Sequence, residues 1–253
     1  MLSNTTKAKL DAGEVVLGTF IRYHDPSFTE YVALQGWDFL VFDGEHGTLE
    51  PHQVENLVRA AELRGVTPVV RVPTNQPHLI LRYLDTGAHG VHVPWVNTPA
   101  EVDTAVRSVK YHPRGIRGLA GSRAGDWGIT EPMSEYTARS NRETLVVIHI
   151  ETQEAVDAVA DYLAVDGVDV IFLGPTDLSQ SLGVPGELDH PQVVEALEQV
   201  ADVVVPSEKA LGVFAGDLAS ARRWIERGAR YVATDSDRLL RRGMQEFLNE
   251  ARR

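Results

Sequence analysis

Short apolar runs rich in Val, Ile and Phe recur along the chain, and segments with helical periodicity lie between them. We expect eight strands, at residues 15–19, 39–43, 68–71, 90–94, 145–151, 168–173, 211–215 and 231–234. We expect helices at residues 51–64, 77–86, 99–109, 154–163, 191–198, 218–227 and 237–251, several of which open on proline, which is tolerated at the first helical position. This alternation is typical of βα units around a parallel sheet.

Eight βα units in 253 residues match the size of one (β/α)8 barrel, so we expect an α/β fold with a single domain over residues 1–253. No linker rich in Ser, Gly or Pro divides the chain, and no internal repeat is evident. In such a barrel, the polar side chains that directly follow the strands converge on one mouth, where active sites lie.

The composition excludes several classes of function. The chain has 24 basic and 36 acidic residues, a net charge of −12, which disfavours nucleic acid and anionic membrane surfaces as partners. It has no cysteine, which excludes disulfides, thiolate metal sites and a cysteine nucleophile. There is no secretory signal in the first 13 residues and no apolar run long enough to span a bilayer, so we expect a cytoplasmic protein.

Two carboxylates follow neighbouring strands of the predicted barrel. Glu151 follows the run 146–150, and Asp177 follows 171–173 through a Gly-Pro turn. Two carboxylates would leave about four coordination positions to water and a chelating substrate, which suits Mg²⁺ or Mn²⁺. A carboxylate at this position is also common as a helix cap or an ion-pair partner. In the same turn, the amides of Thr176 and Asp177 could hold an anion at the start of a helix, or form an ordinary Asp-capped turn.

A histidine and an arginine complete the predicted mouth. His46 lies three residues after Asp43, and an Asp that orients a His is a common way to build a base near neutral pH. Arg71 ends another strand. There its guanidinium would face an anionic substrate or the oxyanion of a reaction, or form an ion pair with Asp43 or Glu45.

Two further segments concern contacts with substrate and partners. The longest irregular stretch, residues 111–129, is expected over the active face of the barrel. Nine arginines lie between Arg222 and Arg253, and we interpret them as a solvated helix face with subunit contacts rather than an anion site. The last helix has an apolar stripe that could pack on its own barrel or on a neighbouring subunit, formed by Leu240, Met244, Phe247, Leu248 and Ala251.

The ordered set of motifs resembles the HpcH/HpaI aldolases, the pyruvate-dependent class II aldolases typified by 4-hydroxy-2-oxoheptane-1,7-dioate aldolase. The resemblance covers nearly the whole chain, at residues 17–20, 37–47, 71–73, 84–88, 111–118, 150–152 and 174–179. It implies a barrel of the phosphoenolpyruvate/pyruvate type. It also implies a homohexamer, built as a trimer of dimers, that exchanges the last helix between subunits.

The resemblance also implies roles for individual residues. Glu151 and Asp177 would bind a divalent ion, Mg²⁺, Mn²⁺ or Co²⁺, that chelates the keto acid. Arg71 would steady the enolate oxygen, Asp43 and His46 would form the family's Asp–His pair, and the amides of Thr176 and Asp177 would hold the pyruvate carboxylate.

Two positions concern substrate preference. His149 stands where close relatives often have Gln, two residues before the metal-binding Glu, so the polar contact near pyruvate is expected to differ. Arg123, in a segment that resembles the acceptor side of the family's site, is expected to contact the aldehyde or a distal carboxylate. We interpret His92, by contrast, as a packing residue.

The implied reaction is reversible retro-aldol cleavage of a 4-hydroxy-2-oxo acid to pyruvate and an aldehyde, through a metal-bound pyruvate enolate, with His46 removing the C4 hydroxyl proton. Independently, no lysine ends a predicted strand, which disfavours a Schiff base; the four lysines are Lys7, Lys9, Lys110 and Lys209. Two alternatives are a citrate-lyase-like or malyl-CoA lyase, for which no nucleotide site is evident, and a non-catalytic oligomer that binds keto acids.

Overall fold

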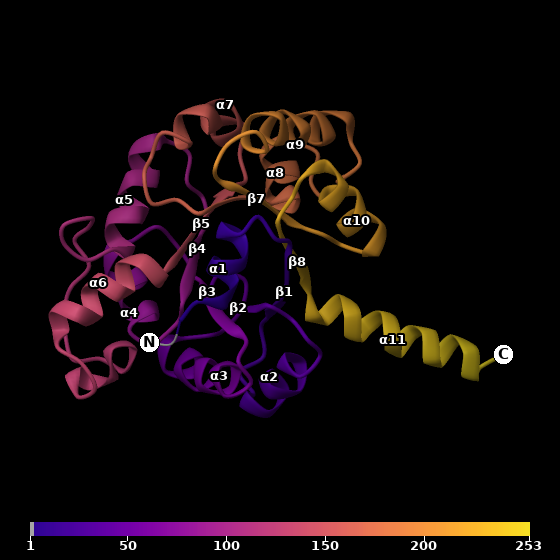
Figure 1. Ribbon diagram of the computed structural model, residues 1–253. Coiled ribbons are helices and arrows are strands. Elements are labelled where there is room, and N and C mark those ends of the chain that lie inside the picture. The colour runs from indigo at the N-terminus through magenta and orange to yellow at the C-terminus, as the bar shows by residue number, and fades with distance from the viewer. Residues whose placement is uncertain (1–2) are drawn as a thin grey trace.

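The computed structural model describes residues 3–253, which form a closed barrel of parallel strands with β8 paired to β1 (Figure 1). The strands are β1 (Val16–Ile21), β2 (Phe39–Asp43), β3 (Thr67–Arg71), β4 (Gly90–Val93), β5 (Leu145–Ile150), β6 (Val170–Leu173), β7 (Ala210–Phe214) and β8 (Tyr231–Asp235). The prediction of a (β/α)8 barrel is confirmed, and all eight strands lie where the apolar runs predicted them.

The helices mostly cover the outer face of this barrel, although α1 precedes the first strand and α11 projects away from the barrel. They are α1 (Thr5–Asp11), α2 (Pro26–Ala33), α3 (Pro51–Leu63), α4 (Pro77–Leu84), α5 (Pro99–Val109), α6 (Met133–Glu143), α7 (Gln153–Tyr162), α8 (Pro175–Ser181), α9 (Pro191–Val204), α10 (Leu218–Arg227) and α11 (Ser236–Ala251). The sequence-based expectation did not include α1, α2, α6 and α8. Three of these are short, and α6 buries a mostly polar face of Tyr136, Ser140 and Asn141, so it lacks the apolar period of the others.

Alternation along the strands separates two cores. In β2, Phe39 and Val41 belong to the core inside the barrel, whereas Leu40 and Phe42 belong to the core between sheet and helices. Asp43, the next inward position, lies at the mouth at the end of the strand. Leu10 of α1 packs into the inner core, at the end of the barrel opposite the mouth. The alternation of side-chain direction along each strand therefore decides which polar residues at the strand ends face the mouth.

The segment 111–129 does not cover the mouth, so that expectation was wrong. It follows α5, which runs antiparallel to the strands and ends near their N-terminal ends. From there it packs along the outer side of the barrel, where Arg117 pairs with Asp85 at 2.8 Å and Arg123 pairs with Glu62 of α3. Residues Arg123–Gly128 form a short 3₁₀ turn in it.

The last helix, α11, leaves the barrel and projects away from it (Figure 1). Of its residues only Ser236 is buried. Leu240 is half-buried, and the other large apolar side chains are exposed; Phe247, for example, is 72% exposed. The apolar stripe therefore does not pack on the barrel of its own chain. Among the described residues, no helix is both long and apolar enough to cross a membrane.

Candidate active site

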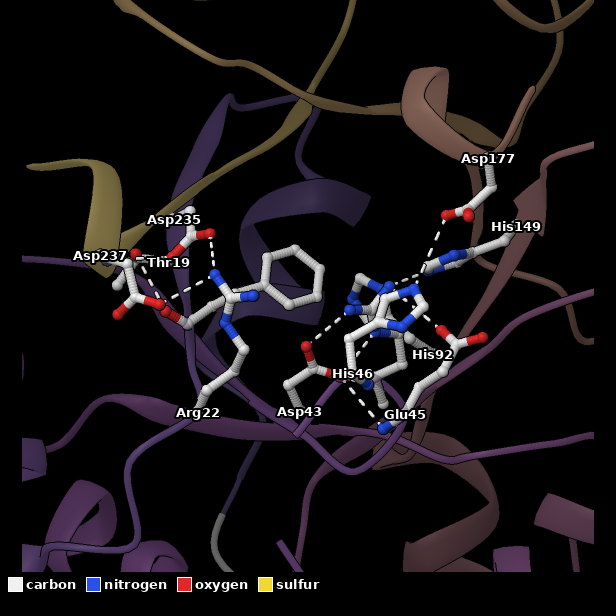
Figure 2. A network of polar contacts seen from close by, with 12 residues as sticks. Thr19, Arg22, Asp43, Glu45, His46, His92, His149, Asp177, Asp235 and Asp237 are labelled. Carbon is white, nitrogen blue, oxygen red and sulfur yellow. Dashed lines mark hydrogen bonds and ion pairs between the residues drawn. The ribbon is translucent and has the colours of Figure 1, made fainter. Parts of the chain in front are cut away.

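The inward-facing residues at the C-terminal ends of the strands line a cavity of about 580 Å³. The structure brings together there every residue that the sequence suggested for the site except Arg123, namely Asp43, His46, Arg71, His149, Glu151, Thr176 and Asp177. In Figure 2, Asp43, Glu45 and His46 lie on one side of this space, and Asp177 and His149 face them.

Arg71 is held in a fixed plane by two carboxylates. Its Nε donates to Oδ1 of Asp43 at 2.9 Å, and its Nη2 donates to Oδ2 at 2.6 Å. Its Nη1 lies 3.1 Å from Oε2 of Glu45, and its guanidinium lies over the ring of Phe20, 4.9 Å from the ring centre. Burial opposes the charge of Arg71, but these carboxylates outweigh burial and raise its pKa. The ion-pair interpretation of Arg71 is therefore correct, and it is compatible with a role toward substrate.

Asp43 does not hold the imidazole of His46, contrary to the expectation of an Asp–His pair. Its Oδ1 accepts from the main-chain amides of Glu45 and His46, both at 3.1 Å. The guanidinium of Arg71 binds both oxygens of the same carboxylate. The His46 side chain is 50% exposed, and its Nε2 lies 3.8 Å from Oδ2 of Asp177, beyond hydrogen-bond distance.

Glu151 lies buried just after β5, and the protein binds both of its oxygens. Oε1 lies 2.6 Å from Nδ1 of His149, and Oε2 accepts from the amide of Trp95 at 3.0 Å. Trp95 has a φ of 53°, in the left-handed region that residues other than glycine rarely adopt. Burial raises the pKa of Glu151, but His149, this amide and Arg71 outweigh burial and hold the pKa below its usual range.

Gly174 makes room for Glu151. A Cβ at Gly174 would lie 2.7 Å from Cγ of Glu151, closer than real Cβ contacts, and 3.0 Å from its Oε1, which is also tight. Gly174 is also the residue that precedes α8, which carries Thr176 and Asp177 in its first turn. Their amides have no acceptor within the helix, because the first N–H groups of a helix precede the repeating bonds. The turn at Gly174 thus brings the carboxylate of Glu151 close to the free amides of Thr176 and Asp177.

The acidic residues of the mouth fit a bound cation. Glu45 has its pKa raised to about 8, mainly by burial and further by Glu151, Asp43 and Asp177, although Arg71 opposes the shift. The neighbouring carboxylates contribute to this shift, and a divalent ion held by Glu151 and Asp177 would offset their negative charge. Among residues 3–253, no group of three or more His, Cys, Asp or Glu side chains converges as a metal site. A metal would therefore rest on Glu151 and Asp177 alone and keep open positions.

Arg123 lies outside the mouth, and its expected contact with substrate is not found in this chain. Its Nη1 donates to the main-chain oxygen of Thr86 at 2.8 Å, and its Nη2 pairs with Glu62. It lines a separate pocket of about 400 Å³ with Arg59 and Trp127. The physical reason is the course of the segment 111–129, which runs along the outside of the barrel.

His149 faces the mouth but has no free ring nitrogen for substrate. Nδ1 is bound to Glu151, and Nε2 lies 2.8 Å from Nδ1 of His92. The expected substrate contact through its nitrogens is therefore replaced by contacts within the protein. His92 packs in the barrel as expected, but it also takes part in hydrogen bonds that its interpretation as a packing residue did not include.

The far side of the cavity carries residues that the sequence reasoning missed. Arg22, which follows β1, pairs with Asp235 and with Asp237, whose Oδ2 lies 2.9 Å away (Figure 2). Asp235 also accepts from the amide of Asp237 at 2.9 Å and so caps α11. Arg238 and Arg241, two of the nine arginines interpreted as solvated, line the same cavity. Arg22 directly follows β1, and the other residues end or follow β8, so their positions at the C-terminal ends of strands could have indicated that they line the mouth.

Three comparisons place the chain among known proteins. The family model described as HpcH/HpaI aldolase/citrate lyase matches residues 17–241. The 5-keto-4-deoxy-D-glucarate aldolase of Shigella boydii is 40% identical over 238 residues, which cover 92% of this chain and 90% of that one. An HpcH/HpaI aldolase/citrate lyase family protein from Burkholderia cenocepacia has a TM-score of 0.94 at 34% identity and covers 99% of this chain and 100% of its own. The HpcH/HpaI aldolase of Desulfitobacterium hafniense has a TM-score of 0.92 at 31% identity, over 99% and 97%.

Proposed function

Because the chain belongs to the HpcH/HpaI aldolase/citrate lyase family, we propose that it is a class II aldolase that cleaves a 4-hydroxy-2-oxo acid reversibly to pyruvate and an aldehyde. Relatives named as aldolases support lyase chemistry. The observation that carries the proposal is the composition of the mouth, which joins the carboxylates Glu151 and Asp177 to an immobilised guanidinium and one exposed imidazole.

In the proposed reaction, His46 accepts the proton of the C4 hydroxyl group. The bond between C3 and C4 then breaks, its electron pair forms the enolate of pyruvate, and the aldehyde leaves. Arg71 has five N–H donors, of which Asp43 occupies two, so donors remain for the enolate oxygen. The amides of Thr176 and Asp177 orient the pyruvate carboxylate. Transfer of one proton from solvent to C3, and loss of one proton from His46 to solvent, completes the release of pyruvate and restores the base.

Glu151 and Asp177 are the residues that would hold a divalent cation. The ion would supply Lewis acidity at the 2-oxo oxygen and so favour enolate formation. Mg²⁺, Mn²⁺ and Co²⁺ all suit two carboxylates completed by water and substrate. The protein contributes the orientation of Glu151, through His149, Trp95 and Gly174.

The decisive assay measures pyruvate released from 4-hydroxy-2-oxo acids, starting with 5-keto-4-deoxy-D-glucarate, before and after chelation with EDTA. We expect activity to disappear with EDTA and to return when Mg²⁺ or Mn²⁺ is added. Full activity in the chelated protein would rule out the metal route. Metal-dependent exchange of the C3 protons of pyruvate separates an enzyme from a protein that only binds keto acids, because binding alone does not catalyse exchange.

The proposed assembly is a hexamer, a trimer of dimers in which α11 packs on a second copy of the chain. Two observations support it. The apolar face of α11, which includes Met244 and Phe247, is exposed in the single chain. Beside the start of the helix, Leu17, Trp37 and Leu218 line a largely apolar groove of about 390 Å³ on the barrel. A second copy would bury both surfaces.

A further inference from the structure

A chain of hydrogen bonds runs from Glu151 at the mouth into the centre of the barrel. Nδ1 of His149 lies 2.6 Å from Oε1 of Glu151, and Nε2 of His149 lies 2.8 Å from Nδ1 of His92. Nε2 of His92 lies 2.8 Å from the hydroxyl oxygen of Tyr231. All four residues are at most 2% exposed, so water does not compete for these bonds. Figure 2 shows the two imidazoles next to each other below Asp177.

The donors and acceptors of this chain follow from its two ends. Glu151 is ionised and only accepts, so Nδ1 of His149 donates to it. At the other end, the buried hydroxyl group of Tyr231 donates to Nε2 of His92, which leaves Nδ1 of His92 to donate to Nε2 of His149. Burial raises the pKa of Tyr231 well above its usual range, so Tyr231 keeps its proton. Burial lowers the pKa of His92 well below its usual value, and the charge of Arg71 adds to this, so His92 is neutral.

Packing alone does not explain these polar groups. The inner core around them is apolar, and the ring of Phe172 contacts His92, His149 and Tyr231 with centre-to-centre distances of 5.1, 4.9 and 6.1 Å. Phenyl rings would fill the same space without polar atoms. Buried polar groups cost stability unless each is hydrogen-bonded, and here every ring nitrogen has a partner.

We propose that His92 and Tyr231 are positioning residues for Glu151 and act on its carboxylate through His149. One nitrogen of His149 donates to Glu151 and the other accepts from His92, so the ring can neither flip nor change its tautomer without breaking a hydrogen bond. His149 and the amide of Trp95 each bind one oxygen of Glu151, which fixes the plane of the carboxylate and leaves a lone pair on each oxygen for a metal ion. This inference rests on the proposed function, in which Glu151 binds a divalent ion.

Metal affinity of the assembled protein tests the proposal without reference to turnover. In His92→Phe, which keeps a ring but removes the hydrogen bonds, we expect the Kd for Mn²⁺ to rise about tenfold or more. In Tyr231→Phe, one bond further away, we expect a smaller rise. In His149→Gln, the amide can donate to Glu151 and accept from His92, so we expect a Kd close to that of the unmodified protein.

Val147→Ala is the matched packing control. Val147 is fully buried in the same inner core, paired in register with His92, and has no polar group to lose. We expect a lower melting temperature and an unchanged Mn²⁺ Kd. If His92→Phe and Tyr231→Phe behave like Val147→Ala, the hydrogen-bonded chain only packs and the proposal is wrong. If the unmodified protein binds no Mn²⁺, the metal of the proposed function fails, and the inference fails with it.

The tautomers give a second readout that needs neither metal nor substrate. Solid-state ¹⁵N NMR of protein labelled at histidine should show a proton on Nδ1 of both His92 and His149, with signals assigned from their loss in His92→Phe and His149→Gln. In His92→Phe, the signal of His149 should broaden or divide between tautomers. An unchanged His149 signal in His92→Phe would show that His92 does not hold the ring and would overturn the proposal.

Discussion

Asp43 binds Arg71 through both carboxylate oxygens, at 2.9 and 2.6 Å, while its Oδ1 also binds the amides at the start of the segment that carries His46. One carboxylate thus fixes the plane of the guanidinium and the position of the proposed base. Burial raises the pKa of Asp43, but Arg71 and the amides of His46 and Glu45 outweigh burial and lower the pKa, so Asp43 stays ionised at neutral pH.

Arg71→Lys should remove the enolate contact while keeping the charge. Lysine cannot reproduce the fork that Asp43 binds, so its ammonium would sit elsewhere. We expect the exchange of the C3 protons of pyruvate in D₂O, followed by ¹H NMR, to slow by about 10²- to 10³-fold. Arg22→Lys, at the other end of the cavity, is the matched control and should slow exchange far less. An unchanged exchange rate in Arg71→Lys would show that Arg71 does not stabilise the enolate.

Gly174→Ala should displace Glu151, because the added Cβ would lie 2.7 Å from its Cγ. Overpacking of this kind costs about 1–3 kcal/mol of stability. We also expect weaker Mn²⁺ binding and a lower kcat. Gly118→Ala is the control, since a Cβ there would meet only the side chain of Leu81, at 3.4 Å. Equal metal affinity in the two variants would mean that Gly174 does not position the carboxylate.

Lys110 should make the free energy of unfolding depend on pH in the alkaline range. It is 2% exposed, and Nζ donates to the main-chain oxygens of Asn141 and Thr144 at 3.0 and 2.7 Å. Burial lowers its pKa from 10.5 to about 8. Between these values the unfolded chain holds the proton and the folded chain does not. The contribution of Lys110 to the free energy of unfolding therefore rises with pH over this window, by about 3 kcal/mol in total.

Urea unfolding of the unmodified protein and of Lys110→Met at pH 8 and at pH 10.5 measures this contribution. The difference in unfolding free energy between the two proteins should move in favour of the unmodified protein as the pH rises. A difference that stays constant over the window would show that the amine remains charged in the folded state, held by the two carbonyl groups.

Phe247→Glu should break the proposed assembly. Phe247 is 72% exposed in the single chain and lies on the apolar face of α11, so a charge there would be buried in an interface. We expect light scattering after gel filtration to show smaller species. Asn249→Glu introduces the same residue on the opposite face of the helix and should leave the hexamer intact. A monomer in the unmodified protein would contradict the proposal directly.

Much of the fold could be predicted from the sequence because strands buried on both faces read as continuous apolar runs, such as Leu145–Ile150. The positions of Asp43, Arg71 and Glu151 could be predicted as well, since each follows or ends such a run at the mouth. The polar helix α6 and the course of the segment 111–129 could not be predicted, because neither shows a regular spacing of apolar residues.

The partners of the site residues were harder to predict than their positions. His92 and His149 lie on neighbouring strands, whereas Tyr231 comes from β8 on another side of the barrel. Their meeting depends on the stagger of the strands and on side-chain directions across the barrel, which no local pattern encodes. Similarly, the preference of Asp43 for Arg71 over His46 follows from the geometry of the guanidinium fork, not from the spacing of Asp43 and His46 in the sequence.

The lysines of the chain all lie at the end of the barrel opposite the mouth. Lys7 and Lys9 are on α1, and Lys7, Lys110 and Lys209 line a cavity of about 490 Å³ beside the first residues of β5 and β7. Amine-directed coupling, through a succinimidyl ester for example, would therefore attach a dye or a resin to the base of the barrel. Protein immobilised in this way would present its open mouth to the solution, and the reagent would leave the carboxylates, arginine and histidine of the candidate site unmodified.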